Sequence, residues 1–217
     1  MPSFTHLLFD LDGTLTNPRL GIGNSLRYAL GQMKIDGYSD EILERFIGPP
    51  LQVGFKTLFG LNERNTNLAV EHFRTYFGEK GLYENIPYPG ISELLEELHL
   101  SGKRIYVVTS KLEKYAHMII RHFEFDRYID DLQGAEYTGN HSGKGQLISQ
   151  LMERNRISAD PSVVMIGDTQ YDMAGATEQG ISSIAVGYGF GTHESLRTCN
   201  PDFFVDSVDE LSELLLG

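Results

Sequence analysis

The chain has 217 residues, of which 41% are hydrophobic and 22% are charged, a composition typical of a folded globular protein. This length can bury a sizeable core, either in one domain with an insertion or in two small domains. Thirty acidic residues against 18 basic ones give a formal net charge of −12. Because nucleic acids and anionic membranes are also negative, this charge disfavours both as partners.

Cysteine content and hydropathy indicate the cellular compartment. The single cysteine, Cys199, cannot form an internal disulfide, which suits a reducing environment. No apolar run approaches the roughly 18 residues needed to span a bilayer. The first apolar run, "HLLF", lacks a preceding basic region, so we interpret it as a strand and not as a signal peptide. We therefore expect a cytoplasmic protein, either a monomer or a homodimer.

Near the start, residues 4–18 read "FTHLLFDLDGTLTNP", in which Asp10 and Asp12 follow an apolar, strand-like run. In an extended segment, residues two apart point to the same side, so both carboxylates face one way at the end of the strand. Two like charges this close repel each other. The two usual solutions are a shared proton and a bound cation.

Residues 21–86 have the pattern of a helical block. Apolar residues recur at helical spacing, and Ser39 with Asp40 can cap a second helix within the block. We find no clear strand there. The sequence thus predicts an inserted all-helical domain over residues 17–86, with hinges near 14–21 and 80–90, where Gly and Pro collect.

From residue 87 onward, short β-branched runs alternate with amphipathic helices, which predicts a parallel sheet covered by helices on both faces. We expect helices at 91–103, 112–123, 144–155 and 172–180, and strands at 104–109, 130–136, 162–168 and 182–187. The fold class is therefore α/β, with a Rossmann-like parallel sheet formed by residues 1–16 and 87–217. Such sheets bind ligands at the carboxyl ends of their strands.

The predicted strand ends carry chemically useful side chains. Asp10 and Asp12 follow the first strand, Thr109 and Ser110 end the second, and the fourth leads into "GDTQYD" with Asp168 and Asp172. Four carboxylates at one sheet edge are unfavourable without a cation, and an oxygen-only ligand set favours Mg²⁺. Taken alone, Asp168 could equally be a turn residue or a helix N-cap.

Lys144 stands at the start of a predicted helix, where its charge is unfavourable to the helix dipole. An isolated lysine at such a position is usually a solvated surface residue. At the active edge of the sheet, however, its ammonium could neutralise a carboxylate nucleophile and an incoming phosphate. Lys111, beside the hydroxyl pair, and Arg45, in the helical block, are competing candidates.

Four motifs together carry a family resemblance: "DLDGTLT" at 10–16, "VVTS" at 107–110, Lys144, and "GDTQYD" at 167–172. In order and spacing they resemble the motifs of the haloacid dehalogenase superfamily. The match covers the whole chain, and the helical insertion resembles the cap of that superfamily's first cap class. The overall pattern is similar to phosphoglycolate phosphatase-like members.

The resemblance implies a role for each motif residue. Asp10 would be the nucleophile that forms an aspartyl-phosphate, and Asp12 the general acid and base. Asp10, the backbone carbonyl of Asp12 and Asp168 would bind Mg²⁺, and Asp172 would complete the metal site by holding its shell of waters. Thr109 and the Ser110 backbone N–H would bind phosphate oxygens, while Lys144 would favour the ionised form of Asp10.

Within this superfamily Asp12 favours phosphate monoester hydrolysis, since dehalogenation needs no acid for a departing alkoxide. The sequence therefore predicts a Mg²⁺-dependent phosphatase for small phosphorylated metabolites, either phosphoglycolate or nucleoside 5'-monophosphates. A sugar phosphomutase is the enzymatic alternative. A phospho-accepting signalling receiver is the non-enzymatic one, although the helical insertion and Asp12 disfavour it.

Two loops remain to be interpreted. "RFIGPPLQ", residues 45–52, either provides substrate selectivity through Arg45 or merely ends a helix at Pro49 and Pro50. "GYGFGT", residues 187–192, lacks the lysine and helix start of a P-loop, so we interpret it as a turn after the last core strands.

Overall fold

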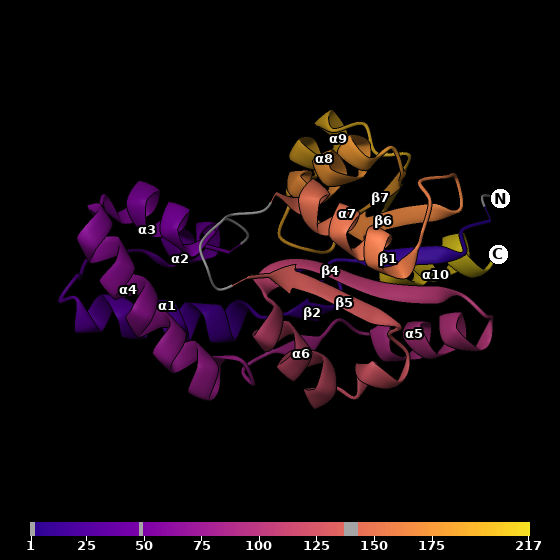
Figure 1. The fold of residues 1–217 in the computed structure, drawn as a ribbon. Coiled ribbons are helices and arrows are strands. Elements are labelled where there is room, and N and C mark those ends of the chain that lie inside the picture. The colour runs from indigo at the N-terminus through magenta and orange to yellow at the C-terminus, as the bar shows by residue number, and fades with distance from the viewer. Residues whose placement is uncertain (1–2, 48–49, 137–142) are drawn as a thin grey trace. The chain divides into compact units, whose positions relative to one another are not determined.

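The computed structural model describes residues 3–47, 50–136 and 143–217. The chain divides into two compact units, which are coloured by residue number in Figure 1. Met1–Asn17 and Pro87–Gly217 form the core unit, and Pro18–Ile86 form the helical unit.

The core unit contains a six-stranded sheet in which every neighbouring pair is parallel. The strands lie in the order β5-β4-β1-β6-β7-β8, so the direction of strand progression reverses around β1. Residue registers place Phe9 of β1 opposite Val107 of β4 and Ile166 of β6. The bounds are β1 His6–Phe9, β4 Arg104–Leu112, β5 Asp131–Ala135, β6 Val163–Gly167, β7 Ser182–Val186 and β8 Phe203–Val205.

The central strands are apolar on both faces, as expected for a parallel sheet that is covered by helices. Leu7, Leu8 and Phe9 of β1 are fully buried, and all five residues of β6 are buried. Helices α7 (Lys144–Asn155) and α8 (Gln170–Gln179) cover one face, where Leu147, Ile148 and their neighbours pack on Leu8 and Met165.

The helices of the core unit follow the strands in alternation. Figure 1 shows α5 and α6 on the opposite side of the sheet from α7 and α8, as right-handed crossovers in the two directions from β1 require. The bounds are α5 Ile91–Leu100, α6 Glu113–His122, α7 Lys144–Asn155, α8 Gln170–Gln179, α9 His193–Thr198 and α10 Val208–Leu216.

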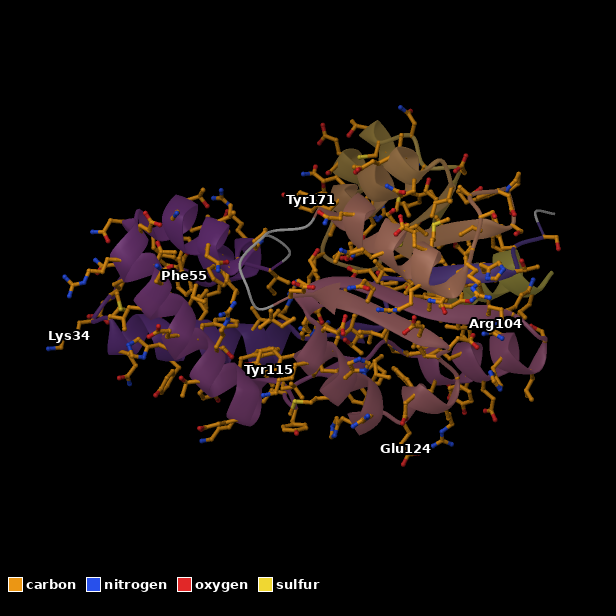
Figure 2. All side chains as sticks on the ribbon, in the orientation of Figure 1. Lys34, Phe55, Arg104, Tyr115, Glu124 and Tyr171 are labelled. Atoms are coloured by element: carbon orange, nitrogen blue, oxygen red, sulfur yellow. The ribbon has the colours of Figure 1, made fainter. Side chains whose placement is uncertain are left out.

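The helical unit is built around clustered phenylalanines. The ring of Phe46 lies 4.8 Å from that of Phe55 and 5.9 Å from that of Phe73. Figure 2 shows Phe55 inside this unit, whereas Lys34 points away from it. The elements are α1 Arg19–Gln32, α2 Asp40–Arg45, α3 Leu51–Phe59, α4 Glu63–Tyr76 and a π-helical turn at Phe77–Gly81.

The structure confirms the predicted α/β core and its helix–strand alternation, and it adds elements that sequence reasoning missed. These are the edge strand β8, the helices α9 and α10, and a two-stranded sheet of β2 Thr16–Asn17 and β3 Ile86–Pro87. The missed strands have only two or three residues each, too few to show a hydrophobic period. None of the helices in the described ranges is both long and apolar enough to cross a membrane.

Candidate active site

The sheet topology places three of the predicted motifs side by side. Asp10 directly follows β1, Thr109 lies in the last part of β4, and Asp168 directly follows β6. Since β1 hydrogen-bonds to β4 on one side and to β6 on the other, their carboxyl ends meet at the point where the strand order reverses. This is where open α/β sheets bind their ligands.

A tight turn follows β1 at this edge of the sheet. The backbone N–H groups of Leu15 and Thr16 both donate to the Leu11 carbonyl, and Gly13 N donates to the Thr16 carbonyl. Gly13 has a φ of 92°, in the left-handed region that favours glycine. A Cβ at this position would also overlap the Asp168 carboxylate, so the turn and the carboxylate depend on the absence of a side chain.

Three acids converge at the centre of the site. Asp10, Asp168 and Asp172 are all buried, and one oxygen from each lies within 4.8 Å of the others. Asp168 Oδ2 accepts a hydrogen bond of 2.7 Å from the Phe190 backbone N–H. Its Oδ1 is buried and accepts none from the residues that the structure describes. Within the described ranges, that oxygen is therefore available to an external ligand.

Asp172 is oriented by the start of its own helix. Its Oδ2 accepts hydrogen bonds from the Thr169 backbone N–H at 3.0 Å and from the Thr169 hydroxyl at 2.7 Å. The Thr169 side chain in turn caps the N–H of residue 172, completing a capping box. The capping interaction leaves Asp172 Oδ1 directed at the acidic centre, where it pairs with Lys144.

Lys144 connects two of the three acids. Its Nζ lies 2.9 Å from Asp10 Oδ1 and 2.7 Å from Asp172 Oδ1, and it donates a 3.0 Å hydrogen bond to the Val108 carbonyl. The side chain is 3% exposed. Burial disfavours the ammonium, but Asp10 and Asp172 outweigh it and raise the pKa of Lys144 above its ordinary value. The position at the first turn of α7 thus serves the site and not the helix.

Without a bound cation, burial and mutual repulsion disfavour the ionised forms of the clustered carboxylates. Burial, opposed by Lys144 and reinforced by Asp172, raises the pKa of Asp10 to about 6. Burial also raises the pKa of Asp168 well above its ordinary value, with further contributions from Asp172 and Asp10. Lys144 alone does not neutralise the cluster.

The residues present fit a bound Mg²⁺. The donor set consists only of oxygens, the three acids carry more charge than Lys144 can balance, and Asp168 Oδ1 has no hydrogen-bond partner in the described part of the chain. Mg²⁺ prefers carboxylate oxygens and a few waters, which matches this set. Asp12 lies outside this group of three, and the prediction that its backbone carbonyl binds the metal stays a prediction.

The end of β4 supplies hydroxyl and ammonium groups. The register between β4 and β5 shifts between Val108 and Leu112, so this part of the strand is irregular. Thr109 is buried, and its Oγ1 accepts a 3.2 Å hydrogen bond from the Lys111 backbone N–H. Ser110 is exposed, and Lys111 forms an ion pair with Asp12 Oδ2. Lys111 is therefore a second cation at this edge.

The loop of residues 187–192 is the part of the site that sequence reasoning missed. Phe190 N binds Asp168, and the Tyr188 hydroxyl donates a 3.1 Å hydrogen bond to the Thr14 carbonyl. A Cβ on Gly189 would overlap both the Asp168 side chain and the Gly13 carbonyl oxygen. The interpretation as a simple turn is therefore incomplete, because the loop packs directly on a predicted metal ligand. Glycine at every second position was the available signal.

Arg45, the predicted selectivity residue, belongs to the other unit. It is the last residue of α2 and is exposed. Gly48 and Pro49 of the predicted selectivity loop lie outside the described residues, and Pro50 precedes α3 as its N-cap.

Comparison with known proteins decides the family. The model of the haloacid dehalogenase-like hydrolase family matches residues 7–186, which include every motif of the site. The chain belongs to this family. Among its relatives, a 5'-nucleotidase from Pseudomonas aeruginosa is 42% identical over 212 residues, covering 98% of this chain and 96% of the relative.

Two further relatives also align over nearly their whole length. A phosphoglycolate phosphatase from Vibrio parahaemolyticus is 28% identical and aligns with 96% of this chain and 95% of its own. The crystal structure of a predicted phosphatase from Clostridium acetobutylicum superimposes with a TM-score of 0.92 at 37% identity, covering 99% of both chains. The similarity of this haloacid dehalogenase-like hydrolase to a solved structure thus covers 99% of the chain.

Proposed function

We propose that this chain is a Mg²⁺-dependent phosphatase that hydrolyses small phosphate monoesters through an aspartyl-phosphate on Asp10. The observation that carries the proposal is the buried Lys144 ammonium between Asp10 and Asp172, beside Asp168, whose Oδ1 has no hydrogen-bond partner among the residues that the structure describes. A buried nucleophile with a fixed counter-ion and an acidic cation site are the parts that phosphoryl transfer requires.

In the first step, an oxygen of the ionised Asp10 carboxylate forms a bond to phosphorus while the ester P–O bond breaks. Asp12 gives its proton to the departing oxygen, which leaves as an alcohol. Asp12 lies two residues from the nucleophile, after the same strand, and 22% of its side chain is exposed to solvent, from which it can take up the proton. The phosphoryl group is then held as a mixed anhydride on Asp10.

In the second step, water attacks the phosphorus of the aspartyl-phosphate. Asp12, now ionised, accepts the proton from that water, and the Asp10–phosphorus bond breaks to release inorganic phosphate. Both residues return to their starting protonation states. One acid–base residue thereby serves the two half-reactions in opposite directions.

The surrounding groups stabilise the charge that moves during both steps. Lys144 holds the Asp10 carboxylate in place and offsets its negative charge. Because Thr109 Oγ1 already accepts from the Lys111 N–H, its own hydrogen is available to a phosphate oxygen. Asp10, Asp168 and Asp172 would hold Mg²⁺, which would supply positive charge to offset the carboxylates and the phosphoryl oxygens.

The proposed substrates are phosphoglycolate and nucleoside 5'-monophosphates. Relatives named for each of these activities support both classes, and the net charge of −12 disfavours a polymeric nucleic acid. A sugar phosphomutase remains the alternative, since the same aspartyl-phosphate could pass its phosphoryl group to a sugar hydroxyl in place of water.

The test is a phosphate-release screen over phosphoglycolate, nucleoside monophosphates, sugar phosphates and an aryl phosphate, with and without Mg²⁺. We expect turnover that EDTA abolishes and Mg²⁺ restores, and none from Asp10→Asn. Full activity in excess EDTA would overturn the metal assignment. Isomerised sugar phosphate without released phosphate would instead favour the phosphomutase.

A further inference from the structure

Lys111 is a nearly buried cation for which the proposed mechanism has no use. Its side chain is 8% exposed, and its ammonium pairs with Asp12 Oδ2. Its backbone N–H donates to Thr109 Oγ1 at 3.2 Å. Withdrawing an ammonium from water is costly, so its charge needs an anionic partner. One residue therefore contacts both Thr109 and Asp12.

The ion pair with Asp12 cannot persist throughout the reaction. Asp12 Oδ1 is buried, and Oδ2 is the oxygen that the Lys111 ammonium occupies. For Oδ2 to face the departing oxygen of a substrate, the ammonium has to move to another anion. The arriving phosphate monoester brings up to two negative charges to the same place, since Thr109 is the hydroxyl that receives it.

We propose that Lys111 is a second phosphate-binding cation of this site, whose ammonium exchanges Asp12 for an oxygen of the bound phosphoryl group. This inference rests on the proposed function. Once the ammonium has left, Asp12 Oδ2 can take up a proton from solvent and give it to the leaving-group oxygen, so the acid forms only when substrate is present. The exchange also keeps the Lys111 charge partnered in both states, which a buried ammonium requires.

The ligand is the phosphoryl group and not the part of the substrate that leaves. Thr109 and Asp12, which Lys111 contacts, act on atoms that every phosphate monoester shares. Loss of the ammonium should therefore weaken binding of inorganic phosphate itself. A residue that recognised a substrate carboxylate or a base would leave inorganic phosphate binding unchanged.

The experiment measures binding of inorganic phosphate by calorimetry in Mg²⁺ buffer, so that no turnover is needed. The variants are Lys111→Met, which keeps the length and removes the charge, and Lys111→Arg, which keeps the charge. Lys114→Met is the matched control, because Lys114 lies three residues away and is exposed. Loss of a hydrogen bond to a charged group predicts roughly 10- to 100-fold weaker phosphate binding for Lys111→Met. Binding by Lys111→Arg should stay within a few-fold of the parent, and Lys114→Met should be unchanged.

Phosphate binding by Lys111→Met within two-fold of the parent would overturn the inference, as would an equal loss in Lys114→Met. Should Lys111→Met fail to fold, Lys111→Gln retains a hydrogen-bond donor for Asp12 and is expected to show the same loss of phosphate binding. A parent protein that binds no phosphate also contradicts the inference. A parent that binds phosphate through Lys111 but hydrolyses no ester would contradict only the proposed function.

Discussion

Asp10 and Asp12 differ in burial and in partner, although only one residue separates them. Asp10 is buried beside Lys144, whereas Asp12 is partly exposed and pairs with Lys111. The covalent mechanism requires the Asp10 oxygen itself, so Asp10→Asn should abolish turnover. Asp12→Asn removes only the proton donor and should lower turnover by roughly 10²- to 10⁴-fold. The turnover of the two variants is measured as steady-state phosphate release from an aryl phosphate.

Circular dichroism of the two variants is the control, and both should match the parent. Near-normal turnover by Asp10→Asn would contradict the aspartyl-phosphate. Equal, complete loss in both variants would mean that Asp12 does more than move a proton.

Asp168 offers a test of stability that needs no turnover. Burial, then Asp172 and Asp10, raise the pKa of Asp168 well above its ordinary 3.8, so the ionised group costs folding free energy without metal. This cost is absent below pH 3.8 and complete above the raised folded-state pKa. Asp168→Asn should therefore raise the metal-free melting temperature at pH 7 by roughly 2–8 °C, corresponding to about 1–2 kcal/mol.

The same thermal scans contain the controls for Asp168→Asn. The gain should shrink as the pH falls toward 4, where the parent carboxyl becomes protonated. Mg²⁺ should raise the melting temperature of the parent but not of the variant. A variant that is less stable than the metal-free parent at pH 7 would show that the carboxylate is not strained.

Individual residues of the site were predictable to different degrees. Asp10, Asp12 and Asp168 were predictable because each follows an apolar strand, a pattern that is local in sequence. The Lys111–Asp12 pair joins positions 99 residues apart, and the Val108 carbonyl bonded by Lys144 depends on how α7 meets β4. Such contacts come from tertiary packing, which leaves no local pattern to recognise.

The loop of residues 187–192 acts as an element that supports the predicted metal site. Phe190 N holds one Asp168 oxygen, and Gly189 packs where a Cβ would overlap both Asp168 and the Gly13 carbonyl. Gly189→Ala should therefore displace Asp168 and weaken Mg²⁺ affinity by at least about 10-fold, in the range for altered supporting contacts of metal ligands. Calorimetric titration with Mg²⁺ measures this.

Gly31→Ala is the matched control for Gly189→Ala. Gly31 lies in α1, is exposed, and has no atom within 4 Å of the added methyl position. The Gly31→Ala variant should keep the Mg²⁺ affinity of the parent. Its free energy of unfolding should be equal or slightly higher, because alanine is the better helix former. If Gly189→Ala binds Mg²⁺ as tightly as the parent, the loop does not support the metal site.

At the element level, what was predictable depended on length. The apolar run Leu7, Leu8 and Phe9 of β1 and the helical periods of α5, α6 and α7 are clear in the sequence, whereas the ten-residue α8 shows little periodicity. The three-residue β8 and the six-residue α9 are too short for such a signal, and the loop between β7 and α9 acquires its role only through contacts with Asp168 and Thr14.

The residues proposed to carry out the reaction occupy only one of the two units of the chain. Every residue that we assign to phosphoryl transfer belongs to the core unit and acts on atoms that all phosphate monoesters share. Discrimination among substrates must therefore use other residues, and the helical unit of Pro18–Ile86 is the large part of the chain without an assigned task. Arg45, an exposed cation on α2, is the predicted selectivity residue.

We expect Arg45→Ala to change the ranking among phosphoglycolate, nucleoside monophosphates and sugar phosphates, because a guanidinium favours substrates with a second anionic group. Turnover of a small aryl phosphate should stay within a few-fold of the parent. Arg64→Ala, another exposed arginine of the helical unit, is the control and should leave the ranking unchanged. An equal loss on every substrate would assign Arg45 to folding or to motion of the unit, whereas an unchanged ranking would exclude it from recognition.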